Sequence, residues 1–235
     1  MTKDEVMAQL EAMGPEQTRK TWRNHGCTIP MFGVKVGDLK TIVKKVKMDP
    51  ALGRELYATG NTDAMYLAGL ITPGAALRPD ELDTWVRAAG WSMHSESTVP
   101  WVASEHSQGW EIALRWIDDP SDLVASAGWA TLSCWVSIQP DDRLDLAGLQ
   151  GLLDRVARTI HQAGNRVRYT MNSFVIAVGV AVPALTEAAR ATARTVGPVT
   201  VNMGGTACQV PEAIGYIQKS IDRGQHGKKR KTAKC

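Results

Sequence analysis

The chain has 235 residues, of which 44% are hydrophobic and 22% are charged, a balance typical of folded globular proteins. It has no run of 18 uncharged apolar residues and no apolar leader after Met1. We therefore predict no membrane-spanning helix and no secretory signal, and we expect a cytoplasmic protein without membrane contact. Four scattered cysteines exclude a disulfide framework.

Charge is distributed unevenly along the chain. The segment from Lys219 to Cys235 holds seven lysines and arginines against one acid, a net charge of +6, so residues 1–218 carry −3 of the total +3. We predict one domain over residues 1–218 and a basic tail over residues 219–235. A like-charged block resists folding and suits phosphate contacts, although a solubilising terminus explains it equally well. The predicted phosphate contacts are Lys228, Lys229, Arg230 and Lys231.

Apolar residues recur at helical spacing through most of the chain. Residues 36–46 form the first such stripe, and residues 82–89 follow a proline at position 79, which suits a first helical turn. Further helices are predicted over 146–160, 169–182 and 184–195, the second of them buried on all sides. A strand signal occurs only at 199–201. Helix pairs of about 40 residues predict an all-α solenoid of HEAT or armadillo-like repeats, with a globular helical bundle as the alternative.

Known catalytic and cofactor motifs are missing. There is no phosphate loop, dinucleotide fingerprint, HExxH or Gly-x-Ser-x-Gly. His25 and Cys27 form one short pair, whereas zinc requires about four ligands, so we predict neither a metal nor a cofactor. Tryptophan is unusually abundant: seven of the eight lie between Trp85 and Trp135.

The segment from Gly90 to Trp101 places an aromatic residue, a histidine and a carboxylate within two helical turns. It resembles the DNA alkylation repair family of AlkD-like alkylpurine DNA glycosylases, in which an analogous stretch reads Trp-Trp-Asp-Ser-Val-Asp-Ser-x-Val-Pro. Trp91, Ser97, Val99 and Pro100 match that stretch, and Glu96 falls at the catalytic aspartate. The stretches 127–130, 167–174, 202–208 and 227–235 also look like a branch of this family.

The resemblance implies a HEAT-like solenoid whose concave, basic face holds double-stranded DNA. Active members excise cationic N3- and N7-alkylated purines, and a carboxylate stabilises the oxocarbenium-like sugar while helping to place water. The resemblance assigns that role to Glu96. By the same likeness, we expect contact with DNA or the lesion from Trp91, Trp129, Phe174, Arg166 and Arg168, with the three aromatic residues near one another.

Three positions depart from the family pattern. Ser92 replaces a second aromatic residue, Ala127 lies where a groove arginine is expected, and Phe174 replaces a tryptophan. Three hypotheses follow: a glycosylase for alkylated purines, a non-catalytic DNA-binding protein on the same scaffold, and a protein-binding helical scaffold. The basic tail favours the two DNA hypotheses, and the departures favour binding without catalysis.

Overall fold

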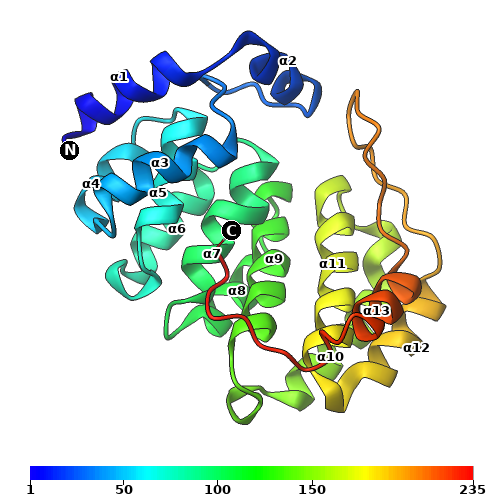
Figure 1. Cartoon of the computed structure of the whole chain (residues 1–235). Helices are drawn as coiled ribbons and strands as arrows, with labels where there is room; N and C mark the ends of the chain where they lie inside the picture. The colour runs from blue at the N-terminus through cyan, green and yellow to red at the C-terminus, as the bar shows by residue number, and fades with distance from the viewer. Residues whose placement is uncertain (235) are drawn as a thin grey trace.

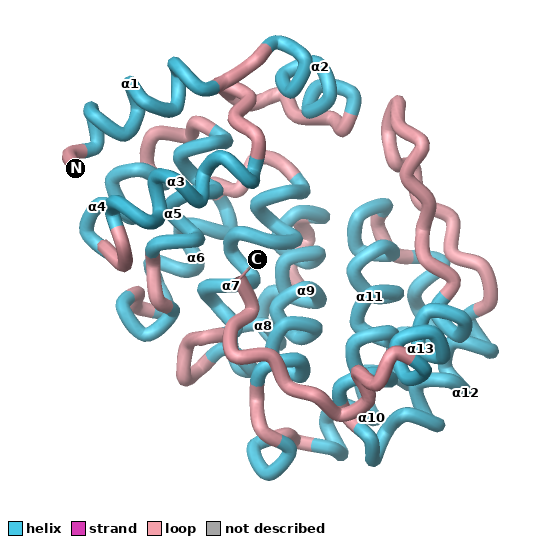
Figure 2. The backbone as a smooth tube through the Cα atoms, in the orientation of Figure 1, coloured by secondary structure: helices cyan, strands magenta, loops and turns pink. Residues whose placement is uncertain are grey.

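The computed structural model describes residues 1–234, and this part of the chain is built from helices without a β-strand (Figures 1 and 2). Short 3-10 turns and one π-helical turn, η2 (His94–Thr98), link the α-helices. The α-helices are α1 (Lys3–Met13), α2 (Glu16–Asn24), α3 (Val36–Val46), α4 (Pro50–Tyr57), α5 (Thr62–Ile71), α6 (Pro79–Arg87), α7 (Val99–Ser104), α8 (Gly109–Trp116), α9 (Asp122–Ile138), α10 (Leu146–Thr159), α11 (Asn165–Ala181), α12 (Thr186–Val196) and α13 (Ala213–Asp222).

Helix positions follow the apolar periodicity closely. The stripe at 36–46 is α3, and the proline at position 79 opens α6. The stripes at 146–160 and 184–195 are α10 and α12, each within two residues of the predicted bounds. The buried helix predicted over 169–182 is α11, which begins four residues earlier at Asn165. Residues 199–201 are extended but form no strand.

The helices stack as antiparallel pairs, with α4–α5, α8–α9 and α10–α11 as successive examples (Figure 1). The second helices of the pairs share one direction. At the amino ends of α9 and α11, the Arg166 amide donates to Asp122 Oδ2 at 3.1 Å. At their carboxyl ends, Lys229 Nζ donates to the carbonyl oxygens of both Val136 and Ala181. This stacking confirms the predicted HEAT-like solenoid.

Two hydrophobic cores lie side by side along the stack. The first extends from α1 to α9, and the second extends from α8 to α13. Helix α9 belongs to both, since Val124 and Ala127 pack in the first core and Trp129 and Leu132 pack in the second. The all-round apolar character of α9 and α11 results from this central position, which leaves neither helix a wide solvent face.

A buried carboxylate fixes the segment between α2 and α3. Asp63, fully buried in the first turn of α5, accepts backbone N–H bonds from Phe32, Gly33 and Val34 at 2.6–3.1 Å. Burial raises the pKa of Asp63, and the three amide donors oppose that rise. Asp63 therefore fixes the path of the chain where it enters α3.

The basic C-terminal segment packs against the body of the protein. We call residues 223–234 the strap; in Figure 1 it runs from α13 across the front of the molecule to the region of α7. Lys229 pairs with Asp141, Ala233 is 1% exposed in the first core, and Lys234 donates to the Thr72 carbonyl and pairs with Glu105. The predicted boundary between residues 218 and 219 falls inside α13. Two lysines of the strap, Lys229 and Lys234, donate to carbonyl groups at helix carboxyl ends, where a cation is favourable.

Candidate functional site

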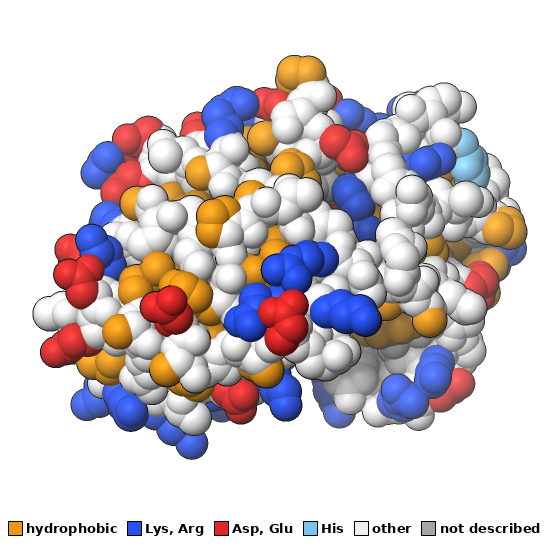
Figure 3. All heavy atoms as spheres, turned by 90° about the horizontal axis from the view of Figure 1, so that it is seen from above, with side chains coloured by type: hydrophobic (Ala, Val, Ile, Leu, Met, Phe, Trp, Pro, Cys, Tyr) orange, Lys and Arg blue, Asp and Glu red, His pale blue; other side chains and the backbone are white. Residues whose placement is uncertain are grey.

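A cleft of about 620 Å³ opens at the amino ends of the stacked helices. Its walls come from α2 and the turn after it, the segment 90–97, the first turns of α9 and α11, and the loop around residue 203. The lining residues are Thr21, Trp22, His25, Gly26, Gly90, Trp91, Ser92, Met93, Glu96, Ser97, Leu123, Asn165, Arg166, Asn202, Met203 and Gly204. Figure 3 views this side of the molecule from above; basic, acidic and hydrophobic side chains are interspersed there, and no continuous basic band crosses it.

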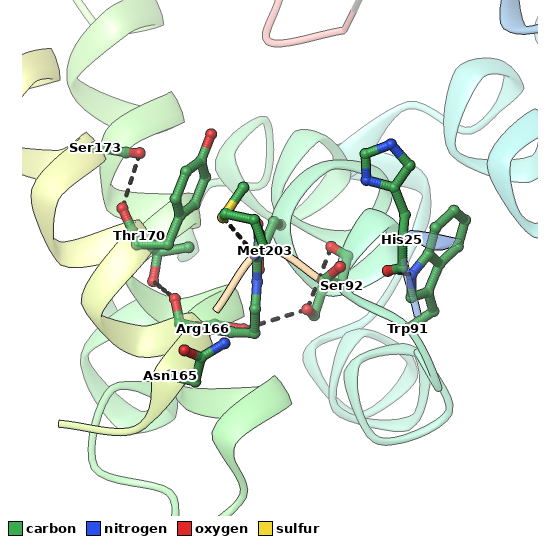
Figure 4. Close-up of polar contacts among 12 residues, drawn as sticks. His25, Trp91, Ser92, Asn165, Arg166, Thr170, Ser173 and Met203 are labelled. Atoms are coloured by element: carbon green, nitrogen blue, oxygen red, sulfur yellow. Dashed lines mark hydrogen bonds and ion pairs between the residues drawn. The ribbon is translucent and has the colours of Figure 1, made fainter. Parts of the chain in front are cut away.

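An ion pair between Glu96 and Arg166 closes the floor of the cleft. Arg166 Nε and one terminal nitrogen donate to the two carboxylate oxygens of Glu96, each at 2.5 Å. The Glu96 side chain is 11% exposed and the Arg166 side chain is 20% exposed, so the pair is shielded from water on most sides. The remaining terminal nitrogen of Arg166 contacts the Met203 sulfur at 3.5 Å, and the guanidinium carbon lies 4.6 Å from the centre of the Tyr169 ring. Figure 4 shows Arg166 and Met203 side by side.

Burial and hydrogen bonding act in opposite directions on Glu96. Burial raises the pKa of Glu96 above its ordinary value of 4.5, the two hydrogen bonds from Arg166 oppose the rise, and the nearby Asp122 carboxylate adds to it. Thioethers are weak hydrogen-bond acceptors, so the terminal nitrogen of Arg166 beside Met203 keeps most of its donor capacity. The cleft floor therefore offers a directed donor, while its carboxylate is already occupied.

Trp91 lies on the α2 side of the cleft. Its indole Nε1 donates to the His25 carbonyl at 3.0 Å, and its ring packs against Trp22 with centroids 5.7 Å apart (Figure 4). Only 5% of Trp91 is exposed. The ring thus anchors the turn after α2 to the segment that carries Glu96 and presents little of its face to a ligand.

The loop over residues 197–212 extends across the cleft and meets α2. Asn165 and Asn202 exchange two hydrogen bonds, at 2.7 and 2.9 Å, which hold the base of the loop against α11. At its tip, the Gly205 amide donates to the Asn24 carbonyl at 3.1 Å. The first and last parts of the solenoid are therefore joined above the cleft. Sequence reasoning missed this loop contact, since short asparagine and glycine stretches are also typical of ordinary turns.

The structure brings together Trp91, Glu96 and Arg166 but not the two other predicted aromatic residues. Trp129 is 1% exposed and Phe174 is fully buried, and their rings pack against each other at 5.3 Å in the second core. These two rings thus contact each other, whereas Trp91 packs in a separate cluster with Trp22 and Cys27. Trp129 and Phe174 both belong to central helices whose buried faces require large apolar side chains.

The remaining predicted residues lie outside the cleft. Ala127, at the position of the expected arginine, is fully buried in the first core. Arg168 is half-buried on α11, and its Nε has no hydrogen-bond partner within residues 1–234. In the strap, Lys228, Arg230 and Lys231 are exposed, whereas Lys229 turns inward to the helix ends.

Stacked helix pairs, a shared helix direction and a cleft at the amino ends define a HEAT-like helical-repeat protein. The comparisons with known proteins place it more narrowly. The family model described as DNA alkylation repair enzyme matches residues 6–202, and the chain belongs to this family.

Known relatives match all or nearly all of the chain. Uncharacterized proteins of Listeria innocua (Lin0241) and Listeria monocytogenes (Lmo0209) are each 33% identical over 229 residues, which is 95% of this chain and 99% of theirs. A solved structure matches with a TM-score of 0.91 and 36% identity over 100% of both chains. It is described as a new family of proteins related to the HEAT-like repeat DNA glycosylases with affinity for branched DNA structures.

Within residues 1–234, no single helix is long and apolar enough to cross a bilayer. In this described part of the chain, α11 taken together with Pro183–Val196 meets the length and composition criterion, with a bend of 116° between the two parts.

Proposed function

We propose that the protein binds double-stranded arms of branched DNA at the cleft face and does not excise bases. The observation that carries this proposal is the occupation of both Glu96 oxygens by Arg166. A glycosylase carboxylate must face the positive charge that develops on the sugar in the transition state. Glu96 instead faces a guanidinium, which already compensates its charge.

The aromatic residues support binding without excision. A cationic base is attracted to an exposed π-face, but Trp91 is covered by Trp22, and Trp129 and Phe174 are in the core. Ser92 lines the cleft where active members of the family resembled here carry a second aromatic residue. None of the three predicted aromatic residues therefore offers an open face to a lesion, and the Tyr169 ring at the floor is taken up by the Arg166 guanidinium 4.6 Å away.

The electrostatics of the cleft suit a phosphate group. The first turns of α9 and α11 line the cleft with their positive dipole ends, although the Arg166 amide itself donates to Asp122. Arg166 adds a donor that Glu96 holds in place. The relative with affinity for branched DNA shares 36% identity over the full length, which favours this ligand class.

The test compares a labelled four-way junction with linear duplex and single-stranded DNA of equal length, in fluorescence anisotropy at fixed salt. We expect tighter binding to the junction and no release of 7-methylguanine or 3-methyladenine from alkylated duplex, with an active glycosylase as positive control. The double variant Glu96→Gln/Arg166→Gln neutralises both members of the pair. It should bind the junction about tenfold more weakly, the scale of one charge-assisted hydrogen bond. Circular dichroism verifies its fold.

A matched control is Arg143→Gln, which removes an exposed charge near the carboxyl end of α9, away from the cleft. Its junction affinity should change less than twofold. Release of alkylated bases by the wild type would overturn the non-catalytic part of the proposal. Equal affinity for all three DNA forms would overturn the preference for branched DNA. Equal losses in the two variants would overturn the cleft as the binding site.

A further inference from the structure

Helix α3 and its flanks carry a dense group of lysines that have no acidic partner. Residues 35–47 contain five lysines and one acid, Asp38, a net charge of +4 on a body that is otherwise negative. All five are exposed, and none forms an ion pair within residues 1–234. We call them the α3 lysine surface: Lys35, Lys40, Lys44, Lys45 and Lys47.

Most other cations are already used in the folded protein. Arg54, Arg87 and Arg155 pair with acids on neighbouring segments, as Arg166 does in the cleft. Nucleic-acid affinity depends on cations that are free to replace condensed counterions around the phosphates. The α3 lysine surface supplies five such cations, whereas the cleft supplies the one Arg166 nitrogen that Glu96 does not occupy.

Helix α3 presents these charges on one side. Leu39 and Ile42 are fully buried and fix its inner face against the first core. Lys40 and Lys44 are one turn apart, about 130–170° around the helix from the midpoint of Leu39 and Ile42. In Figure 1, α3 lies in front of α5, with its outer side uncovered.

Lys47 has an unusual backbone conformation. It has φ +62° and ψ −151°, the only positive φ at a non-glycine position among residues 1–234. Helix α12 ends in the same conformation, φ +63° and ψ −152°, but there the residue is Gly197. This region is nearly restricted to glycine, because a Cβ atom is strained in it. Lys47 therefore occupies a position at which folding alone favours glycine.

We propose that the α3 lysine surface is a second contact site for the phosphate backbone, which holds a DNA arm that leaves the cleft. The inference rests on the proposed function, because it takes branched DNA as the partner. Lysines act as point charges and suit sequence-independent phosphate contact. The surface does not suit insertion into a bilayer, since the apolar face of α3 is buried in the core.

The experiment measures binding of a four-way junction with long arms across a salt series. The variant Lys40→Gln/Lys44→Gln/Lys45→Gln is compared with Arg158→Gln/Arg194→Gln/Lys219→Gln, which removes three exposed charges from α10, α12 and α13. If all three lysines contact phosphates, the slope of log K against log salt flattens by about 2.7, from about 0.9 per contact. Affinity at low salt should fall at least tenfold, with less than a threefold fall in the control.

A second variant separates binding from folding. Lys47→Gly relieves the backbone strain, so its melting temperature should equal or exceed that of the wild type while its junction affinity falls two- to fivefold. A purely structural or solubilising role predicts no loss of affinity.

The outcomes distinguish this inference from the function on which it rests. If the Glu96→Gln/Arg166→Gln variant loses junction binding while both lysine variants bind as the wild type does, the α3 surface is not a contact site and the cleft proposal stands. If the α3 variant loses binding to phosphatidylserine vesicles but not to DNA, a membrane replaces DNA as its partner. If the wild type binds no DNA, both proposals fail.

Discussion

Glu96 and Arg166 show how a single contact determines what a carboxylate can do. A carboxylate with free oxygens can stabilise a cation or activate water, but one held by a bidentate guanidinium mainly positions that guanidinium. The pair also joins η2 to the amino end of α11, which are 70 residues apart in sequence. Removing one partner of such a shielded pair costs several kcal/mol, because the other charge stays buried.

The first prediction concerns the pH dependence of stability at Glu96. Because its pKa is raised in the folded state, the folded protein holds a proton that the unfolded chain has lost above pH 4.5. The free energy of unfolding of the wild type should therefore fall, relative to Glu96→Gln, as pH rises from 4.5 toward neutrality. Urea unfolding at pH 4.5, 5.5 and 7 measures this, with exposed Glu111→Gln as control. If the stability of the wild type relative to Glu96→Gln rises with pH instead, the hydrogen bonds from Arg166 affect the pKa of Glu96 more than burial does.

A second prediction at this scale concerns His94, for which the pH dependence of stability has the opposite sign. His94 is fully buried, and burial lowers its pKa to about 3 from 6.5. As pH falls below 6.5, the unfolded chain takes up a proton that the folded chain does not, so stability is lost. Between pH 6.5 and 5, the free energy of unfolding of the wild type should fall by about 2 kcal/mol more than that of His94→Gln. Unfolding of both at the two pH values tests this, and parallel losses would contradict it.

At the scale of elements, the loop over residues 197–212 depends on one glycine. Gly204 has φ +72°, and a Cβ atom there would lie 2.6 Å from the Asn24 carbonyl oxygen. The neighbouring Gly205 has room, since the same oxygen would be 3.9 Å from its Cβ. The approach of the loop to α2 therefore requires glycine at position 204 but not at 205.

We predict that Gly204→Ala opens the loop and that Gly205→Ala does not. Strain at positive φ costs about 1–2 kcal/mol, and the contact with Asn24 is displaced as well. The amide of residue 205 donates to the Asn24 carbonyl. Its hydrogen exchange should be faster than wild type in Gly204→Ala. In Gly205→Ala, the amides of the loop should exchange as slowly as in the wild type. Equal exchange in the two variants would show that the contact does not hold the loop.

Elements with a polar face were predictable from the sequence, because an apolar stripe with a 3.6-residue period identifies both a helix and its inner side. Helices α3, α6, α10 and α12 were predicted in this way. Helix α5 was not, because all ten of its residues are buried and leave no polar face to reveal the period. The pairing of Glu96 with Arg166 and the burial of Trp129 depend on how repeats pack, which local spacing does not encode.

At the scale of the whole molecule, the two faces of the stack differ in electrostatic character. The cleft collects helix amino ends, whereas the strap supplies lysines to helix carboxyl ends at Val136, Ala181 and Thr72. Burial lowers the pKa of Lys234, while Glu105 opposes that change. The strap also crosses from the second core to the first, so it couples the two halves mechanically.

We predict that deleting residues 224–235 lowers the free energy of unfolding by about 2–4 kcal/mol, because buried carbonyl groups lose their donors. Urea unfolding should also become less cooperative, with the two cores separating into distinct transitions. The double variant Lys228→Gln/Lys231→Gln removes exposed charges of the same segment and should change stability by less than about 0.5 kcal/mol. A deletion as stable as this double variant would contradict a stabilising strap.

The strap also sets the order in which the protein matures during synthesis. Lys234 is 162 residues beyond Thr72, whose carbonyl it caps, so at roughly 5–20 residues per second the ribosome needs about 8–32 s to deliver it after α5 is complete. During that interval the N-terminal repeats exist as a nascent chain with open helix ends and a gap where Ala233 will be buried. Full stability of the earliest repeats is therefore reached only after all the later ones have been translated.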